Sequence, residues 1–427
     1  MSAALVLAAC DGGGGGADAG GGADAAPGLD AGGGGAPVDV TFEPRNGRDS
    51  SPLPGATIAV DLPDGTRLEQ TTDASARATF SIDWAAGPVD VTVHVAGYSV
   101  LSLVGLRAEH VARHVDGDVL PVPLAANAVR TDLVTLSGAI LNGSNPANVY
   151  QVTGDTAEGA ISQARTPSYS VRVPTGRALQ LVVAEIDYVL RGTSDFTNDY
   201  LAVGTVEVGP LSADTTLDLD LTASPVTMGE VSGSLASPGA GTPLADVALF
   251  GYVTDERDGT FYGAMTSATP NGANVDFTMG YREATDARPL TRYFLEEGSL
   301  ASQIVTRGWP VAGPVALTFL PPPAIVTPAF GVSHSIHDPF ELDRVAPGAE
   351  TALLLMEPDP AERLLWLVVS PGGSATLAFP ALPSGVAAPS VIPAGADLFV
   401  RPQVCERTLG QMCGRFAVGN RQFDVTP

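Results

Sequence analysis

Lysine is absent from this 427-residue chain, and all 22 of its basic residues are arginine. Aspartate and glutamate number 47, which gives a formal net charge of -25 at pH 7. Nucleic-acid-binding proteins need clustered basic side chains to replace the counterions of the phosphate backbone. A chain this acidic repels phosphates, so we expect no nucleic acid partner.

Long apolar runs are also missing. No stretch of about 18 apolar residues follows the N-terminus, so the sequence predicts no transmembrane helix. The 49 glycines and 35 prolines predict many turns and few long helices. A chain of this length is expected to divide into two to four domains.

Cysteine is scarce, and its three positions separate into two groups. Cys10 stands alone near the N-terminus, whereas Cys405 and Cys413 lie close together near the other end. In an exported protein, a disulfide between Cys405 and Cys413 is expected, because the compartment is oxidising. A zinc pair is disfavoured, since no further Cys or His lies near them in the sequence.

Residues 7–10, Leu-Ala-Ala-Cys, resemble the lipobox of bacterial lipoproteins. The resemblance implies that the Cys10 thiol carries a lipid and anchors the chain to a membrane of a Gram-negative cell envelope. Residues 11–35 are rich in Gly, Ala and Asp and predict a disordered tether, spanning on the order of 28 Å. The basic region that usually opens a signal peptide is missing, so we expect Met1 to lie inside a longer signal sequence.

Strand patterns begin at Val38. Residues 57–62 alternate and lead into the turn Pro63-Asp64-Gly65, which predicts a hairpin. Residues 89–96, Val-Asp-Val-Thr-Val-His-Val-Ala, show the clearest period-2 alternation in the chain.

This region, residues 38–128, resembles the carboxypeptidase regulatory-like family of β-sandwiches, which is also described as transthyretin-like or Cna-B-like. The resemblance is carried by four features: residues 52–58 (Pro-Leu-Pro-Gly-Ala-Thr-Ile), Thr72-Asp73, Phe80, and the valine-rich strand that ends at Gly97-Tyr98. It implies a small sandwich that serves as a spacer, stalk or binding module and has no catalytic residues. The family usually has Gly in the turn after Thr-Asp, where this chain has Ala76.

Three further β-rich units are expected, at residues 129–225, 226–323 and 324–427. In the first of them, residues 216–221 alternate between leucine and aspartate and place Leu217, Leu219 and Leu221 on one face. Residues 361–366 fit either a helical turn or a strand. The predicted fold class is all-β, with tandem transthyretin-like or Ig-like sandwiches that follow a signal peptide (1–9) and a disordered linker (10–37).

Aromatic residues make up only 6% of the chain but gather in the third unit. Among them, Tyr252, Tyr262 and Tyr281 are candidate ligand-binding residues, because exposed aromatic rings stack on sugars. Packing of a sandwich core needs the same residue types, so the core is the competing interpretation.

Two histidine pairs are candidate metal ligands. His110 and His114 would share one face of a helix, but the surroundings favour a strand or linker, where such residues stand about 13 Å apart. We therefore expect them to be surface histidines. His334 and His337 could converge in a loop, with Asp338 or Glu341 as a further ligand.

Other chemical motifs are incomplete. Residues 331–335, Gly-Val-Ser-His-Ser, resemble a nucleophile elbow without its final Gly. The acidic stretches 187–199 and 255–258 lack the spacing of a calcium loop, so we expect solvated turns.

Together these patterns predict a lipid-anchored, non-enzymatic structural or binding module of the cell envelope, without a cofactor or bound metal. Its expected partners are the membrane and a polysaccharide or protein of the envelope. One alternative is a carbohydrate-binding adhesive protein that uses the aromatic-rich unit. A second is a metal-dependent hydrolase that uses His334 and His337.

Overall fold

The computed structural model describes most of the chain from Ala36 to Thr426. The residues outside this description are 1–35, 48–49, 127–132, 155–161, 165–166, 177, 192–194, 222–228, 237–247, 256–260, 272–273, 282–286, 298–299, 311–312, 358–362, 394–396, 407–414, 420–424 and 427. The chain forms two compact units. The middle unit comprises residues 130–321, and the split unit combines residues 3–129 with residues 322–427.

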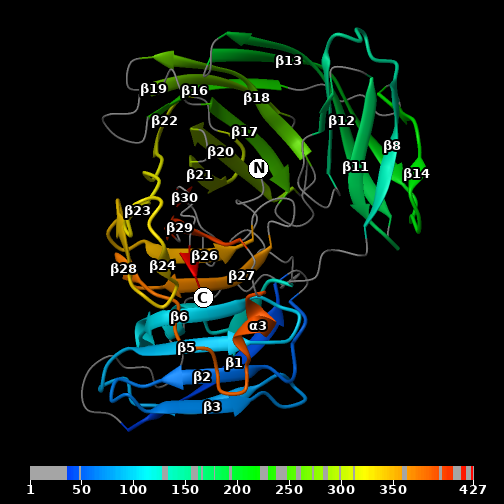
Figure 1. Ribbon diagram of the computed structural model, residues 1–427. Coiled ribbons are helices and arrows are strands. Elements are labelled where there is room, and N and C mark those ends of the chain that lie inside the picture. Colours follow the sequence, from blue (N-terminus) through cyan, green and yellow to red (C-terminus); the bar gives the residue numbers. More distant parts are fainter. Residues whose placement is uncertain are drawn as a thin grey trace. The chain divides into compact units, whose positions relative to one another are not determined.

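The split unit is built on eight strands of one sheet, which come from both the N-terminal and the C-terminal segments of the unit (Figure 1). Neighbouring strands are antiparallel except for β6 and β27, which are parallel. In spatial order the strands are β3 (Arg67–Thr71), β2 (Thr57–Asp61), β5 (Val89–His94), β6 (Val100–Leu106), β27 (Leu364–Ser370), β26 (Glu350–Met356), β29 (Phe399–Glu406) and β30 (Arg415–Val418).

A second, three-stranded sheet covers the N-terminal part of this large sheet. Its order is β4 (Ala78–Ile82), β1 (Val38–Asn46) and β7 (Leu120–Leu124), with β7 parallel to β1. Strand β4 alternates between buried and exposed residues, as expected when one face meets a core and the other meets solvent. Phe42 and Phe80 from this sheet pack edge to face in the shared core, with ring centroids 5.8 Å apart.

The opposite face of the C-terminal strands has its own core. There the covering elements are β23 (Ala324–Thr327), β24 (His334–Ser335), β25 (Phe340–Asp343), β28 (Thr376–Leu377), α3 (Ala388–Val391) and β31 (Val425–Thr426). All seven residues of β27 are buried, because both of its faces are covered. Its continuous apolar run, Leu-Leu-Trp-Leu-Val-Val-Ser, is the pattern of such a strand. The segment that fitted a helical turn or a strand is therefore a strand from Leu364 onward.

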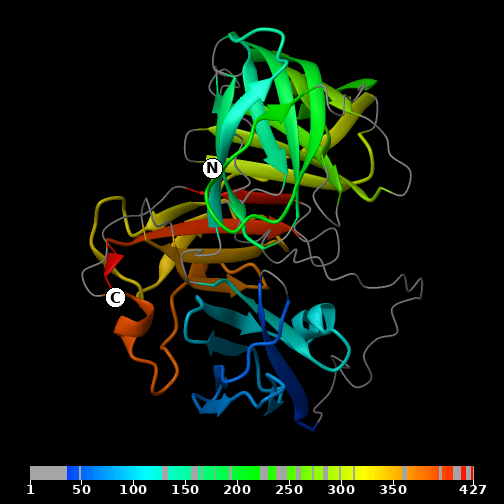
Figure 2. The same cartoon turned by 90° about the vertical axis from the view of Figure 1, so that its right-hand side faces the viewer.

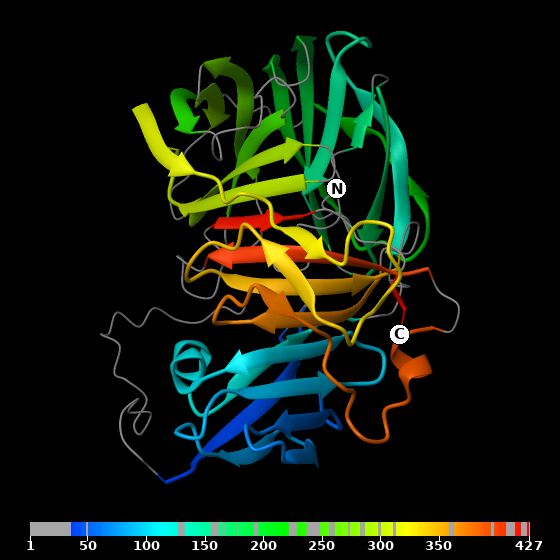
Figure 3. The same ribbon diagram turned by 60° about the vertical axis from the view of Figure 1, so that its left-hand side comes forward.

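The N-terminal and C-terminal segments of the split unit pair through β6 and β27, which lie side by side in Figures 1 and 3. The sequence patterns predict separate units at residues 38–128 and 324–427. In the structure, Val100 to Leu103 pair with Trp366 to Val369, so the two segments share a sheet and a compact unit. The reason is that β6 without β27 would present a row of unpaired backbone groups at a sheet edge.

The middle unit contains two cores. The first core lies between two sheets. One sheet contains β11 (Ser168–Pro174), β8 (Leu133–Leu141), β14 (Thr215–Thr216) and β15 (Leu219–Asp220). The strands that face it are β10 (Ser162–Ala164), β9 (Val149–Gly154), β12 (Leu179–Arg191) and β13 (Asp195–Val208). Leu219 and Leu221 are buried in it, and Leu217 packs against it. The aspartates between them accept hydrogen bonds from Ala139 N and Asn142 Nδ2. The alternation predicted from the sequence is present.

The second core of the middle unit is enclosed by a long antiparallel sheet with one parallel edge pair, β16 and β22. In spatial order its strands are β22 (Gly313–Thr318), β16 (Gly229–Ala236), β19 (Asn274–Tyr281), β18 (Phe261–Asn271), β17 (Ala248–Asp255), β20 (Pro289–Glu297) and β21 (Leu300–Arg307). The protein therefore has the all-β fold class that the sequence predicts. Among the described residues, no helix has both the length and the apolar character needed to cross a bilayer.

Candidate ligand pocket

A cavity of about 200 Å³ lies in the split unit, between its two sheets. Its apolar wall on the large sheet comes from Leu101, Leu103 and Leu106 of β6 and from Leu367 and Val369 of β27. The wall is thus assembled from two strands that are far apart in the sequence. Neither chain segment contains this pocket by itself.

The opposite wall is β7, whose sequence is Leu-Pro-Val-Pro-Leu. This strand is at the edge of its three-stranded sheet, where it pairs with β1. Pro121 and Pro123 have no backbone N–H, so they cannot donate to an additional strand. The wall therefore excludes pairing with an extended peptide and leaves side-chain and carbonyl contacts for a ligand.

A salt-bridge network closes one end of the pocket. Arg45, in the last residues of β1, places Nε 2.6 Å from Glu43 Oε1 and Nη1 3.1 Å from Asp116 Oδ2. Arg77 also contacts Glu43, at 3.0 Å. Partial burial lowers the pKa of Arg45, but the hydrogen bonds and charges of Glu43 and Asp116 outweigh it and raise the pKa overall. The guanidinium at this end is therefore already neutralised by carboxylates.

A histidine and a glutamate line another part of the rim. His114 ends the short helix α2 (Ala108–His114), drawn in cyan in Figure 2, and its Nε2 lies 3.6 Å from Glu350 Oε1 at the start of β26. The Glu350 side chain is 12% exposed. The pocket thus combines an apolar wall with a carboxylate at its rim, which is the usual composition of a small-molecule site.

His110 and His114 were expected to lie on a strand or linker at the surface. This prediction is wrong, because the segment is helical and His110 is only 7% exposed. His110 Nδ1 accepts a hydrogen bond from the backbone N–H of Arg107, at 3.2 Å, and thereby satisfies a free donor at the helix start. Burial lowers the pKa of His110, which favours its neutral form.

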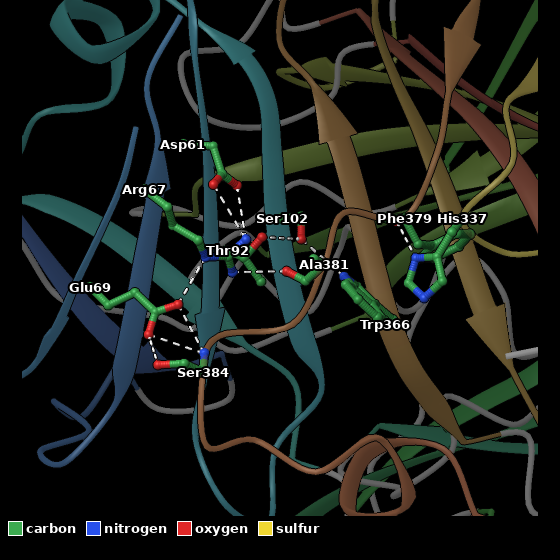
Figure 4. Close-up of polar contacts among 10 residues, drawn as sticks. All are labelled: Asp61, Arg67, Glu69, Thr92, Ser102, His337, Trp366, Phe379, Ala381 and Ser384. Carbon is green, nitrogen blue, oxygen red and sulfur yellow. Dashed lines mark hydrogen bonds and ion pairs between the residues drawn. The ribbon is translucent and has the colours of Figure 1, made fainter. Parts of the chain in front are cut away.

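Polar contacts behind the pocket hold β6 against β27. Trp366 Nε1 donates to Ser102 Oγ at 3.0 Å, and Ser102 Oγ lies 3.0 Å from Thr92 Oγ1 on β5 (Figure 4). All three side chains are buried. Since Ser102 lies between two pocket-lining leucines, these bonds fix the wall in position.

A C-terminal segment also contacts the N-terminal edge of the large sheet (Figure 4). Arg67 donates to the backbone oxygen of Ala381 at 3.0 Å, and Glu69 accepts from Ser384 N at 2.9 Å. Hydrogen bonds from Ser384 and Arg67 outweigh desolvation and lower the pKa of Glu69. These contacts are further ties between the two ends of the chain.

The second histidine pair makes separate contacts. His337 Nδ1 is 2.8 Å from the backbone oxygen of Phe379 (Figure 4), whereas the His334 ring packs on Phe340 at a centroid distance of 4.7 Å. Within the part of the chain that the structure describes, no three His, Cys, Asp or Glu side chains are grouped to hold a metal ion. Ser333, of the elbow-like motif, is an exposed residue of a loop.

The candidate tyrosines fall into different environments. Tyr262 is 6% exposed and belongs to the core, where it packs against Trp309. Tyr281 stacks on the same indole at 5.9 Å and is partly buried. Tyr252 stacks on Phe294 at 5.3 Å, and both residues are half-buried. Burial raises the pKa of the Tyr252 hydroxyl. Tyr252 and Tyr281 are therefore both half-buried, whereas Tyr262 is a core residue.

The structure describes only some of the remaining positions predicted from the sequence. Cys10 lies outside the described residues, as do Cys413 and the acidic stretch after Asp255. Cys405 is in β29, 2% exposed, opposite Phe416 of β30. Asp187 is exposed on β12 and is paired in register with Asp199 of β13.

No protein-family model matches the chain, and no curated protein matches it. Solved structures with a similar arrangement include a candidate adhesin from Bacteroides ovatus, at 11% identity over 44% of this chain and 89% of that chain, with a TM-score of 0.16. A streptococcal ancillary pilin is 9% identical over 65% and 98% of the two chains, with a TM-score of 0.14. BcpA, the major pilin subunit of Bacillus cereus, is 11% identical over 65% of this chain and 98% of that chain, with a TM-score of 0.15. Scores this low define no family.

Proposed function

We propose that this protein is a non-enzymatic binding and structural module of the cell envelope of a Gram-negative bacterium. The observation that supports the binding role is the pocket between the two sheets of the split unit. Its charged groups are engaged in ion pairs, as in Arg45 with Glu43, and are not arranged as a nucleophile with a base. We therefore assign the pocket a binding role.

The proposed anchor is a lipid on Cys10, as the lipobox resemblance implies. Several acyl chains give stable membrane attachment, whereas a single chain gives only marginal attachment. The test expresses the chain with its upstream codons in a Gram-negative host and measures the mass of the N-terminal peptide. A lipid-modified Cys10 in the membrane fraction is expected, and Cys10→Ser should release the protein from the membrane. An unmodified Cys10 would contradict the anchor.

A carbohydrate-binding role is the second candidate, and the stacked pair Tyr252 and Phe294 favours it. Partly exposed aromatic rings on a rigid sheet can stack on a sugar ring. On a glycan array, Tyr252→Ala should abolish a signal that the wild type gives, while Tyr262→Phe keeps it. No signal for the wild type on any glycan would remove this candidate.

The metal-dependent hydrolase gains no such support from the described residues. The imidazoles of His334 and His337 contact Phe340 and Phe379 respectively, without a third ligand grouped beside them. Elemental analysis of the purified protein tests this alternative, and stoichiometric zinc would revive it.

A further inference from the structure

We propose that the loop of residues 326–333 contacts a membrane, by inserting its apolar side chains into the surface of a lipid bilayer. This loop joins β23 to β24 in the split unit (Figure 1). Val326, Phe330 and Val332 are its apolar side chains, and they are 51%, 77% and 51% exposed. The inference rests on the proposed envelope location and adds a second contact with the membrane to the proposed lipid on Cys10.

Exposed apolar side chains are concentrated in this loop. Among the described residues, five large hydrophobic side chains are exposed, and three of them belong to the loop. The other two, Leu141 on β8 and Leu201 on β13, lie in the middle unit. Scattered exposed hydrophobic residues are ordinary on a protein surface, whereas a local group of them marks an interaction site.

The loop also lies in a long stretch of sequence without charge. No Asp, Glu, Arg or Lys occurs between Arg307 and Asp338, although the formal net charge of the chain is -25. Moving an ionised side chain out of water is costly. The loop can therefore enter a lipid surface without desolvating a charge of its own.

The rest of the fold holds the loop in place. Thr327 Oγ1 donates a hydrogen bond to Glu341 Oε2 on β25, at 2.7 Å, and β24 pairs with β31 on the other side. Within the loop, Val332 N donates to Ala329 O at 3.2 Å, and Gly331 supplies the positive φ of 78° that the turn needs. A loop that is ordered in advance loses little conformational entropy when it binds.

The size of the apolar group favours a bilayer over a protein partner. Even a large aromatic side chain has only about 150–250 Å² of surface, and these three side chains are 51–77% exposed. Together they fall well short of the ~800 Å² that each partner of a stable protein complex usually buries. A bilayer surface needs no such minimum, because binding there grows with the apolar area that is buried. A weak insertion of this kind adds to an anchor on the same chain, which raises its effective concentration at the membrane.

Tryptophan fluorescence on vesicles tests the proposal without relying on the lipid at Cys10. The full chain carries Cys10→Ser and an N-terminal histidine tag, which holds it on phosphatidylcholine vesicles that contain a small amount of nickel-chelating lipid. The main lipid is zwitterionic, because an anionic surface would repel a chain with a net charge of -25. Flotation of the vesicles confirms that the protein is bound.

Phe330→Trp places the fluorescent reporter in the loop. Its emission should shift to the blue on the vesicles, and bromine atoms on the acyl chains of the phosphatidylcholine should quench it. Ser81→Trp, at an exposed position on β4 of the same unit, is the control and should show neither effect. The chain without either substitution gives the background of its three native tryptophans.

Two outcomes of this experiment would overturn the proposal. One is quenching of Phe330→Trp no greater than that of Ser81→Trp on vesicles that carry the bound protein. The other is a blue shift that appears without vesicles and grows with protein concentration, which would assign the loop to a contact with a second copy of the chain.

The rate of release from the vesicles measures the strength of the contact. Phe330→Ser should leave vesicles with scarce nickel-chelating lipid about fivefold faster than the wild type, because the apolar area of the ring is lost. Leu201→Ser removes a side chain that is 51% exposed outside the loop, and it should leave at the wild-type rate. Equal rates for Phe330→Ser and the wild type would contradict the insertion. The histidine tag replaces the lipid here, so an unmodified Cys10 and a failed insertion are separate results.

Discussion

Glu185 shows how one buried carboxylate can organise a loop. It is 2% exposed on β12 and accepts hydrogen bonds from Ser144 N and Oγ, at 2.8 and 2.7 Å, and from Asn148 Nδ2 at 2.7 Å. Asn145 N and the Tyr150 hydroxyl donate to the same oxygen. Burial alone raises the pKa of Glu185, but these hydrogen bonds outweigh burial and lower it.

Glu185→Gln should destabilise the middle unit by about 3 kcal/mol, because an amide donor would replace an oxygen that faces several donors. The measurement is the urea unfolding midpoint at pH 7. Glu207→Gln, at an exposed position on the neighbouring strand β13, is the matched control and should change the midpoint little.

The same residue predicts a pH dependence. The folded pKa of Glu185 lies below its unfolded value, which is about 4.3. Its stabilisation is therefore complete above the unfolded pKa and is lost as the pH falls through the folded pKa. The stability difference between wild type and Glu185→Gln should shrink in acid. A difference that stays constant from pH 7 to acid would contradict this account.

A disulfide between Cys405 and Cys413 is a further prediction at the residue scale. Its side chain is buried at the end of β29, where a link to Cys413 would close a loop of hairpin size. The chain-entropy model gives about 2–3 kcal/mol for such a loop. Peptide mapping without reductant should recover the two cysteines as one linked peptide pair, and Cys405→Ser should lower the unfolding midpoint. Free thiols at both positions in exported protein would contradict the prediction.

At the scale of elements, a buried hydrogen bond from Trp366 Nε1 to Ser102 Oγ joins the parallel strands β27 and β6. Ser102→Ala would leave the Trp366 indole N–H buried without its acceptor. The expected cost is about 1–3 kcal/mol in the free energy of unfolding of the split unit. Ser81→Ala, at an exposed position on β4, is the control. Equal stability of the two variants would show that the bridge contributes nothing.

At the scale of the whole molecule, one unit is built from both ends of the chain while residues 130–321 form the other. We expect separately encoded segments 36–129 and 322–427 to co-purify as a complex, because each supplies residues to the same core. Leu101→Asp in the first segment should prevent association, since Leu101 is 5% exposed and pairs with Leu367. Ser81→Asp should not.

One outcome would contradict a core shared by the two segments. If segment 36–129 alone unfolds at the same urea concentration as in the complex, its core does not need the C-terminal strands. Residues 38–128 would then be an independent sandwich, as the resemblance to the carboxypeptidase regulatory-like family implies.

The sequence by itself determined the fold class and much of the strand content. Period-2 alternation in residues 89–94 and 217–221 reports which side chains face a core, and this information is local. It left residues 361–366 open between a helical turn and a strand, and the structure shows that Leu364–Ser370 is a strand buried on both faces. Local periodicity cannot say which partner covers those faces, because a strand accepts any neighbour of suitable direction and register.

Only the tertiary structure decided that β27 pairs with β6, which puts Trp366 beside Ser102 at a separation of 264 residues. The same pairing creates the pocket, so no stretch of sequence contained its signal. The helix at His110 was also decided by context, since its buried face and its contact with Arg107 N outweigh a weak local preference. For the strand pairing and the pocket, the difference was made by contacts between distant segments, which local patterns do not encode.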